Sequence, residues 1–167
     1  MDITIRPARP EEYPALGDLT GQAYLGDGHL TDPGDPYLGV LRDVAGRAAR
    51  AEVLVAVADG TPDAAVLGCV TFVPAPGPMS DIAREGQAEI RMLAVSPAAR
   101  GRGAGETLVR ECLRRAREAG RDGLVLSTQP SMHAAHRLYE RLGFRRTPQR
   151  DWQPVEDLTL LTYELTF

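Results

Sequence analysis

The sequence predicts an α/β fold in which a mixed, mostly antiparallel sheet carries helices on both of its faces. Three observations lead to this prediction. Short apolar or alternating segments that are typical of strands recur along the whole chain. Segments with apolar residues three and four positions apart, which are typical of helices, separate several of them. Two of the strand-like segments, 88–95 and 123–128, are joined through a helical segment, so we expect them to be parallel neighbours.

The expected elements follow one another in the order β-α-α-β-β-β-α-β-α-β-β. Strands are predicted over 3–8, 53–58, 65–73, 88–95, 123–128, 144–148 and 158–167. Helices are predicted over 10–23, 37–51, 104–120 and 131–143. The turn at 59–63 makes its two flanking strands an antiparallel hairpin. The long connection 74–87 is rich in proline and glycine and is a candidate substrate-side loop.

Length and composition favour a single domain over residues 1–167, because 167 residues with 43% hydrophobic content can bury one core. The net charge of −4 argues against general nucleic-acid binding. Up to Ala99 there are fourteen acidic residues and seven arginines, whereas nine acidic residues and twelve arginines follow. The C-terminal part is therefore the one that we expect to bind an anion. Cys69 and Cys112 lie in apolar patterns, which predicts buried free thiols.

No apolar segment approaches the length that spans a membrane, and the N-terminal stretch lacks the apolar centre of a signal peptide. We therefore expect a cytoplasmic protein without a membrane partner. His133 and His136 stand three residues apart, but no third ligand of matching spacing accompanies them. We therefore expect no metal site.

The stretch SPAARGRGAGETLV, residues 96–109, places three glycines and two arginines within six positions. Glycine disfavours a helix by about 1 kcal/mol relative to alanine, so its repeated use indicates a need for bare backbone. At a strand-to-helix junction, glycines let N–H groups converge where the helix dipole is positive, which predicts a phosphate site. A P-loop is excluded because Glu106, not lysine, follows Gly105. A dinucleotide fingerprint is excluded because Glu106 occupies its third glycine position.

The segment RGRGAG, residues 100–105, resembles the R/Q-x-x-G-x-G/A motif of the GNAT superfamily of acetyl-CoA-dependent N-acetyltransferases. The later segment AAHRLYERLGF resembles the A-x-x-x-Y-x-x-x-G-F pattern of the same family at Ala135, Tyr139, Gly143 and Phe144. The resemblance implies a GNAT-like fold whose parallel strand pair is splayed to admit acetyl-CoA as co-substrate.

The resemblance also implies which residues hold the cofactor. The pyrophosphate would lie against the backbone of Arg100, Gly101, Arg102, Gly103, Ala104, Gly105 and Glu106. The pantetheine arm would pair with the backbone of Leu93, Ala94 and Val95. The family often has an asparagine where this chain has Met132, so that polar contact is lost or passes to Ser131 or Ser127.

Acetyl transfer to an amine needs a proton acceptor, because an alkylamine is almost wholly charged at neutral pH. Glu89 lies six residues before Val95, the offset at which the histone-acetyltransferase branch of the family carries its base. Period-two spacing would also place both residues on one side of the strand. The alternative is a solvated Glu89 that pairs with Arg91 or Arg84, with a water chain as the proton acceptor.

A backbone N–H at Val95 or its neighbour would stabilise the oxyanion. Tyr139 matches the family position of the general acid that protonates the leaving thiolate. The alternative for Tyr139 is ordinary packing on a helix face.

These residues predict a GNAT-type N-acetyltransferase that transfers the acetyl group of acetyl-CoA to a primary amine by direct attack in a ternary complex. The alternative is a non-catalytic acyl-CoA-binding or sensor module on the same fold. The acceptor would be a small-molecule amine or a protein N-terminus, and a homodimer is compatible with the sequence. In relatives the acceptor enters beside the segments that correspond to 24–37 and 145–157. These segments supply acidic and aromatic residues that suit a cation, namely Asp27, Asp32, Asp35, Tyr37, Asp151 and Trp152.

Overall fold

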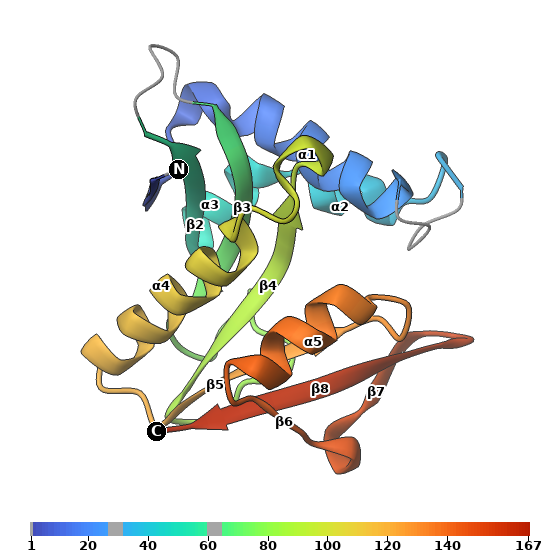
Figure 1. Ribbon diagram of the computed structural model, residues 1–167. Coiled ribbons are helices and arrows are strands. Elements are labelled where there is room, and N and C mark those ends of the chain that lie inside the picture. The colour runs from blue at the N-terminus through green and yellow to red at the C-terminus, as the bar shows by residue number, and fades with distance from the viewer. Residues whose placement is uncertain (1, 27–31, 60–64) are drawn as a thin grey trace. The chain divides into compact units, whose positions relative to one another are not determined.

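The computed structural model of the protein describes residues 2–26, 32–59 and 65–167 (Figure 1). The chain forms two compact units, one of Met1–Phe72 with Met92–Cys112 and one of Val73–Arg91 with Leu113–Phe167. Three elements contribute residues to both units, namely β3 (Val66–Val73), β4 (Gln87–Val95) and α4 (Ala104–Glu118). Among the strand pairs whose register the structure describes, β4 and β5 (Gly123–Thr128) are parallel and the others are antiparallel, which confirms the predicted fold class.

The first unit begins with β1 (Ile3–Pro7), a short 3-10 helix η1 (Pro10–Glu12) and α1 (Tyr13–Gly26). Two short helices follow, α2 (Tyr37–Arg42) and α3 (Val44–Arg50), and then β2 (Glu52–Ala58). β2 pairs antiparallel with β1 and with β3, so the predicted hairpin is confirmed. Most of its predicted turn lies outside the described residues, which resume at residue 65.

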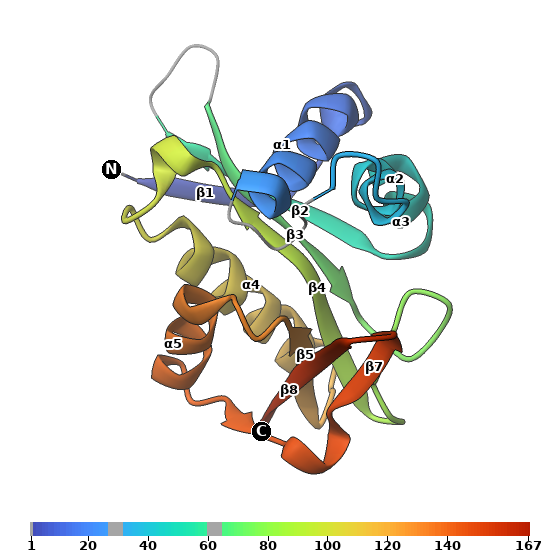
Figure 2. The same cartoon turned by 90° about the vertical axis from the view of Figure 1, so that its right-hand side faces the viewer.

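Helices pack on both faces of the strands in the first unit. Cys69 of β3 is buried in one apolar cluster with Leu16 of α1 and Val44 of α3, and Figure 2 shows both helices beside β2 and β3. Gly68, the preceding residue of β3, faces the other way because strand side chains alternate. A Cβ added to Gly68 would lie 3.4 Å from Leu108 of α4 and 2.6 Å from the carbonyl oxygen of Ala94. Glycine therefore permits the close approach of β3 to α4 and β4.

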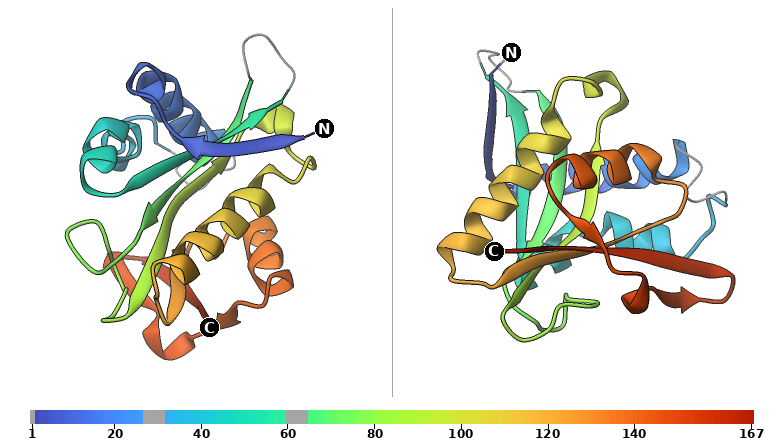
Figure 3. Two further views of the ribbon diagram at one scale, coloured as in Figure 1. Left: turned by 90° about the vertical axis from the view of Figure 1, so that its left-hand side faces the viewer. Right: turned by 60° about the horizontal axis from the view of Figure 1, so that its bottom comes forward.

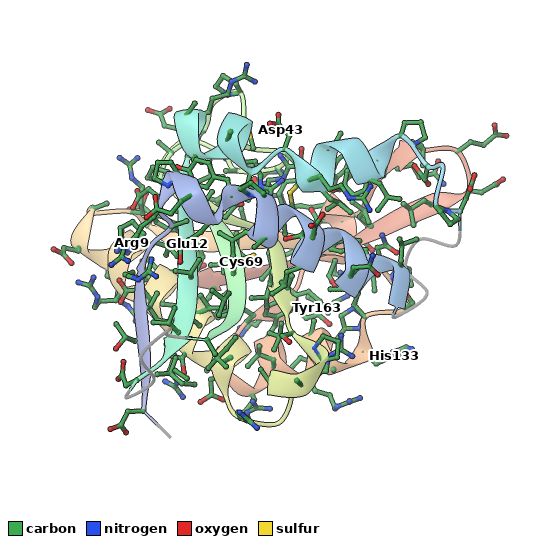
Figure 4. The ribbon with its side chains drawn as sticks, turned by 90° about the horizontal axis from the view of Figure 1, so that it is seen from above. Arg9, Glu12, Asp43, Cys69, His133 and Tyr163 are labelled. Atoms are coloured by element: carbon green, nitrogen blue, oxygen red, sulfur yellow. The ribbon has the colours of Figure 1, made fainter. Side chains whose placement is uncertain are left out.

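The single helix predicted over 37–51 is wrong, because Asp43 divides it into α2 and α3 (Figure 4). Asp43 has φ −81° and ψ 65°, and its Oδ1 accepts a hydrogen bond from Gly46 N at 3.1 Å. Such a side-chain hydrogen bond to the third helical amide is the capping contact that aspartate favours at an N-cap. The buried Arg47 donates to the carbonyls of Val40 and Leu41, both at 2.9 Å, so it satisfies the C-terminal end of α2. The apolar periodicity continues through the break and does not reveal it.

In the second unit the strands lie in the order β4-β5-β8-β6, with β7 paired to β8. The remaining elements of this unit are α5 (His133–Arg141), β6 (Arg145–Arg146), the 3-10 helix η3 (Pro148–Arg150), β7 (Trp152–Val155) and β8 (Leu158–Thr166). The parallel register joins Gln87–Ile90 of β4 to Gly123–Leu126 of β5, which confirms the predicted parallel neighbours.

Two details of the second unit differ from the sequence prediction. The strand predicted over 144–148 is reduced to Arg145–Arg146, and β7 was predicted as part of a loop. Pro154 lies inside β7, and proline is normally excluded from strands except at edges and irregularities. β7 fits both conditions, because within the described residues it pairs only with β8 and the register shifts between Trp152 and Val155.

An aromatic cluster packs α5 against β8, which lie alongside each other in Figure 3. The ring of Tyr139 lies 5.9 Å from that of Tyr163 and 5.7 Å from that of Phe144. His136 adds a third contact, with 5.9 Å between its ring and that of Tyr163. Both Tyr139 and Tyr163 are buried. The cluster therefore fixes the face of α5 that carries Tyr139.

Candidate active site

The glycine turn, Arg100–Gly103, leaves β4 through the 3-10 helix η2 (Pro97–Ala99) and leads directly into α4. Ala99 is buried and anchors the turn to the first unit, whereas all four residues of the turn are exposed. The two predicted arginines, Arg100 and Arg102, are thus on the surface beside the N-terminus of a helix.

Gly101 and Gly103 adopt backbone conformations that other residues resist, with φ of +78° and +82°. A Cβ added to either residue would meet no atom within 4 Å, so conformation rather than crowding inside the protein accounts for glycine here. Gly105 differs, because it lies within α4 and its φ is not positive. Positive φ therefore accounts for glycine at the first two positions and not at the third.

The first turn of α4 presents backbone donors. Thr107 N donates to the carbonyl oxygen of Gly103 at 2.9 Å, and its hydroxyl donates to the same oxygen at 2.7 Å. The preceding amides, those of Ala104, Gly105 and Glu106, belong to the first turn, where backbone N–H groups point toward the N-terminal end of a helix. These amides and the positive end of the helix dipole can bind an anion. The Glu106 carboxylate accepts from Arg110 Nε at 3.1 Å, which reduces its repulsion of such an anion.

The three predicted strand residues, Leu93, Ala94 and Val95, form the end of β4 within the first unit. Met92, immediately before them, has φ +56°, so β4 is not continuously extended between Glu89 and Val95. The period-two argument that placed these two residues on one side of the strand therefore does not apply. A bulge-like irregularity of this kind re-aims the strand that follows it.

Glu89 is fully buried, at 0% exposure, and its carboxylate is surrounded by backbone donors. Oε1 accepts from the amides of Asp81 at 3.1 Å, Ile82 at 2.9 Å and Ala83 at 2.8 Å, and Oε2 accepts from Asp81 at 3.0 Å. Burial raises the pKa of Glu89, and the three amides oppose that shift. The expectation of a solvated Glu89 paired with Arg91 or Arg84 is therefore wrong. Arg91 instead pairs with Asp81, with 3.1 Å between Nε and Oδ2.

The second predicted catalytic residue, Tyr139, lies on α5 of the second unit with 5% exposure. Its backbone carbonyl accepts from Phe144 N at 2.9 Å in the turn that ends the helix, where Gly143 has φ +99°. The A-x-x-x-Y-x-x-x-G-F segment is thus a helix, its C-cap and a packed aromatic pair. The packing that the alternative predicted for Tyr139 is present.

The residues around Met132 are polar but engaged. Met132 is the N-cap of α5 without a capping side-chain hydrogen bond, and its sulfur accepts from the Thr128 hydroxyl at 3.5 Å. The Ser127 hydroxyl accepts from Trp152 Nε1 at 3.0 Å, whereas Ser131 is exposed at the start of the helix. Of the two serines proposed to replace the family's asparagine, Ser131 is therefore the more accessible.

Three of the acidic residues expected beside the acceptor accept hydrogen bonds from nearby residues of the chain. Asp32 and Asp35 accept from the amides of Gly34 at 2.8 Å and Tyr37 at 2.9 Å. Asp151 forms a two-fold contact with Arg146, at 2.9 Å and 2.8 Å, which lowers the pKa of this carboxylate. Asp27 lies outside the described residues.

Among the residues that the structure describes, no group of three or more histidine, cysteine or acidic side chains could hold a metal ion. His133, labelled in Figure 4, lies with its ring 5.8 Å from that of His136. The second histidine has Nε2 3.0 Å from the Gln129 carbonyl oxygen, and burial lowers its pKa. Both cysteines are free thiols and buried, as expected. No helix in the described ranges has the length and apolar character needed to cross a membrane.

Sequence reasoning missed Arg150, which contacts the segment before β4. Its Nη2 donates to the Ile82 carbonyl oxygen, and its Nη1 lies 3.7 Å from Glu164 Oε2. No local signal identifies these contacts, because Ile82 is 68 residues away in the sequence.

Comparison with known proteins extends these observations. The sequence profile of the acetyltransferase (GNAT) family matches residues 18–144. An uncharacterised N-acetyltransferase of Schizosaccharomyces pombe is 31% identical over 100 residues, which cover 60% of this chain and 57% of that protein. N-acetyltransferase 8F1 of Rattus norvegicus is 36% identical over 85 residues, which cover 51% of this chain and 37% of that protein. The matched part of this chain thus spans little more than half the length of the first relative and little more than a third of the second.

Two solved structures were determined with acetyl-CoA. The yncA protein of Salmonella typhimurium has a TM-score of 0.69 and 25% identity, over 98% of this chain and 93% of that one. A GNAT family acetyltransferase of Brucella melitensis has a TM-score of 0.63 and 27% identity, over 99% of this chain and 88% of that one. Since the family profile matches most of the chain and both predicted motifs lie within it or at its end, the chain belongs to the acetyltransferase (GNAT) family.

Proposed function

We propose that this chain transfers the acetyl group of acetyl-CoA to a primary amine by direct attack in a ternary complex. The observation that carries the proposal is the glycine turn, in which Gly101 and Gly103 have positive φ and lead directly into the N-terminus of α4. A diphosphate fits the backbone donors of this helix N-terminus, and Arg100 and Arg102 add positive charge. Membership of the family supports the choice of acetyl-CoA over other phosphate ligands.

We propose further cofactor contacts at the end of β4 and just before the start of α5. The backbone of Leu93, Ala94 and Val95 would pair with the pantetheine arm, and the N–H of Val95 or its neighbour would stabilise the oxyanion. Ser131 would supply a polar contact in place of the asparagine that Met132 replaces.

In the reaction, the neutral amine nitrogen attacks the thioester carbonyl, the new C–N bond forms, and the C–S bond breaks. The proton of the ammonium form leaves before attack, the nitrogen loses a further proton to solvent once it is bonded to carbon, and the thiolate is protonated as it departs. We assign the protonation of the thiolate to the Tyr139 hydroxyl, which regains its proton from solvent. For the proton of the ammonium form the candidate acceptors are Glu89 and a water chain. The four hydrogen bonds that the Glu89 carboxylate already accepts favour water.

The acceptor is a small-molecule amine or a protein N-terminus in this proposal. The family profile includes residues of both compact units, which supports a single acetyltransferase domain over 1–167. The cytoplasmic location and the homodimer stay predictions of the sequence.

Release of free CoA across a panel of amines tests the proposal. A colorimetric thiol reagent should report release that depends on both acetyl-CoA and one class of amine, and mass spectrometry should find that amine acetylated. Reactions without amine control for hydrolysis of the thioester. Tight acetyl-CoA binding without amine-dependent release across small amines and N-terminal peptides would instead favour the sensor alternative.

A further inference from the structure

The segment between β3 and β4 is held by charged side chains that bind its backbone. Residues 74–86 form no helix or strand, and the sequence already marks this connection as a candidate substrate-side loop. Within it, the Glu89 carboxylate accepts from three consecutive amides, those of Asp81, Ile82 and Ala83, at 2.8–3.1 Å. Consecutive amides that converge on one carboxylate fix the conformation of the peptides that carry them.

Arg150 binds the same peptide backbone from its carbonyl side. Its side chain is 8% exposed, and Nη2 donates to the carbonyl oxygen of Ile82. Burial lowers the pKa of Arg150, and the charges of Glu164 and Glu89 oppose that shift. Ile82 thus has its N–H bound by one buried charge and its C=O by another of opposite sign.

Arg91 binds the same segment at Met79, three residues before Ile82. Its Nη1 donates to the Met79 carbonyl oxygen at 3.0 Å, and its Nε lies 3.1 Å from Asp81 Oδ2. The stretch Met79–Ala83 is therefore bound at four of its five residues. Asp81, in the middle of the stretch, is exposed.

The stability of the fold alone does not account for this arrangement. Removing ionised groups from water costs several kcal/mol each, and replacing a buried ion pair by apolar residues is often neutral or stabilising. Glu89 and Arg150 make most of these contacts with main-chain groups of an irregular surface segment. These hydrogen bonds are directional, so they fix the position of the segment more precisely than contacts with apolar side chains would.

We propose that Glu89 and Arg150 are positioning residues for acetyl transfer, which hold Met79–Ala83 in the conformation that binds the acceptor amine. The inference rests on the proposed function. It assigns Glu89 a task other than taking the proton of the amine. None of the residues proposed to hold acetyl-CoA lies in this segment, so the loss of either positioning residue should affect the acceptor and not the cofactor.

The experiment compares Glu89→Gln and Arg150→Met with Glu85→Gln, a matched control in the same segment whose side chain is exposed. Hydrogen exchange of the amides of residues 81–83 reads the contacts without any catalysis. Hydrogen bonds to charged groups are the stronger kind, so we expect exchange to accelerate about tenfold or more in both variants and to stay unchanged in the control. Unchanged exchange in the two variants would overturn the proposal. Arg150→Lys replaces Arg150→Met if the latter does not fold.

Steady-state kinetics with an amine identified by CoA release give the second readout. We expect the KM for the amine to rise about tenfold in both variants, with the KM for acetyl-CoA unchanged and a deficit that does not shrink as pH rises. A loss of kcat confined to Glu89→Gln that recovers at high pH would instead make Glu89 the proton acceptor. If no amine is acetylated, the proposed function fails, whereas accelerated exchange still establishes that the two residues hold the segment.

Discussion

Tyr139 shows how one residue can combine packing with chemistry. Tyr139→Phe keeps the ring contacts with Phe144 and Tyr163, so the free energy of unfolding should change by less than about 1 kcal/mol. The loss of the hydroxyl should lower kcat about 10²-fold if it protonates the thiolate. Because the missing group is a proton donor, the deficit should not shrink as pH rises. A pH–rate profile checks this, and a variant with the kcat of the wild type at every pH would leave Tyr139 with packing alone.

The Arg6–Glu12 pair makes a residue-level prediction for stability against pH. Two hydrogen bonds of 2.8 Å from Arg6 lower the pKa of Glu12 from 4.5 to about 2. A carboxylate whose pKa is lowered on folding stabilises the fold above its unfolded pKa, and that stability is lost as pH falls towards the folded pKa. The pair is partly exposed, so solvent screening reduces its contribution below the full value of the pKa shift. Glu12→Gln should therefore lower the free energy of unfolding by about 2 kcal/mol at pH 6, with a difference that disappears between pH 4.5 and 2. Denaturant titrations at several pH values measure it, and a constant difference would contradict it. Arg9 N also donates to Glu12 at 2.8 Å, and Figure 4 labels both residues.

The sequence predicts the backbone conformation of the candidate site better than the surroundings of its side chains. The glycines at 101 and 103 could be predicted because only glycine readily adopts positive φ, which is a local property. The environment of Glu89 could not, because the amides that donate to its carboxylate belong to a segment without periodicity. The position was predicted correctly within the strand, whereas solvation and hydrogen bonding depend on the tertiary fold.

At the scale of elements, α5 begins without a side-chain cap. Met132 is its N-cap, a position where asparagine can accept a hydrogen bond from the first turn. Met132→Asn should raise the free energy of unfolding by about 1 kcal/mol, with Met132→Ala as the control that removes the sulfur contact without adding a cap. Thermal or denaturant unfolding measures both. Equal stabilities of the two variants would contradict the capping argument.

The elements that the sequence predicted are those with clear periodicity, such as β2, β3, α4 and β5. The missed elements have identifiable causes. β7 contains Pro154, which usually marks a segment as irregular. The break at Asp43 lies within a continuous apolar pattern, and only the capping contact with Gly46 reveals it. The positive φ of Met92 could not be predicted, because no proline or glycine lies at or beside this position.

At the scale of the whole molecule, the order and pairing of the strands followed from the sequence more reliably than their bounds. The parallel pair of β4 and β5 could be predicted because a helix joins two apolar strands. Two ordered motifs then narrowed the fold to one family, and the family profile over residues 18–144 agrees with them. The acceptor could not be predicted, because the residues expected beside it are engaged locally or lie outside the described ranges.

The central claim is that the backbone of the glycine turn binds the pyrophosphate of acetyl-CoA. Calorimetric titration of acetyl-CoA into the wild type, Gly103→Val and Gly120→Val tests it most directly. Both glycines have positive φ, +82° and +73°, and a Cβ at either would meet no atom within 4 Å. The two substitutions therefore impose similar backbone strain, but only Gly103 lies in the turn. We predict that Gly103→Val weakens acetyl-CoA binding at least about tenfold while Gly120→Val binds as the wild type does. A folded Gly103→Val variant with the affinity of the wild type would contradict the claim.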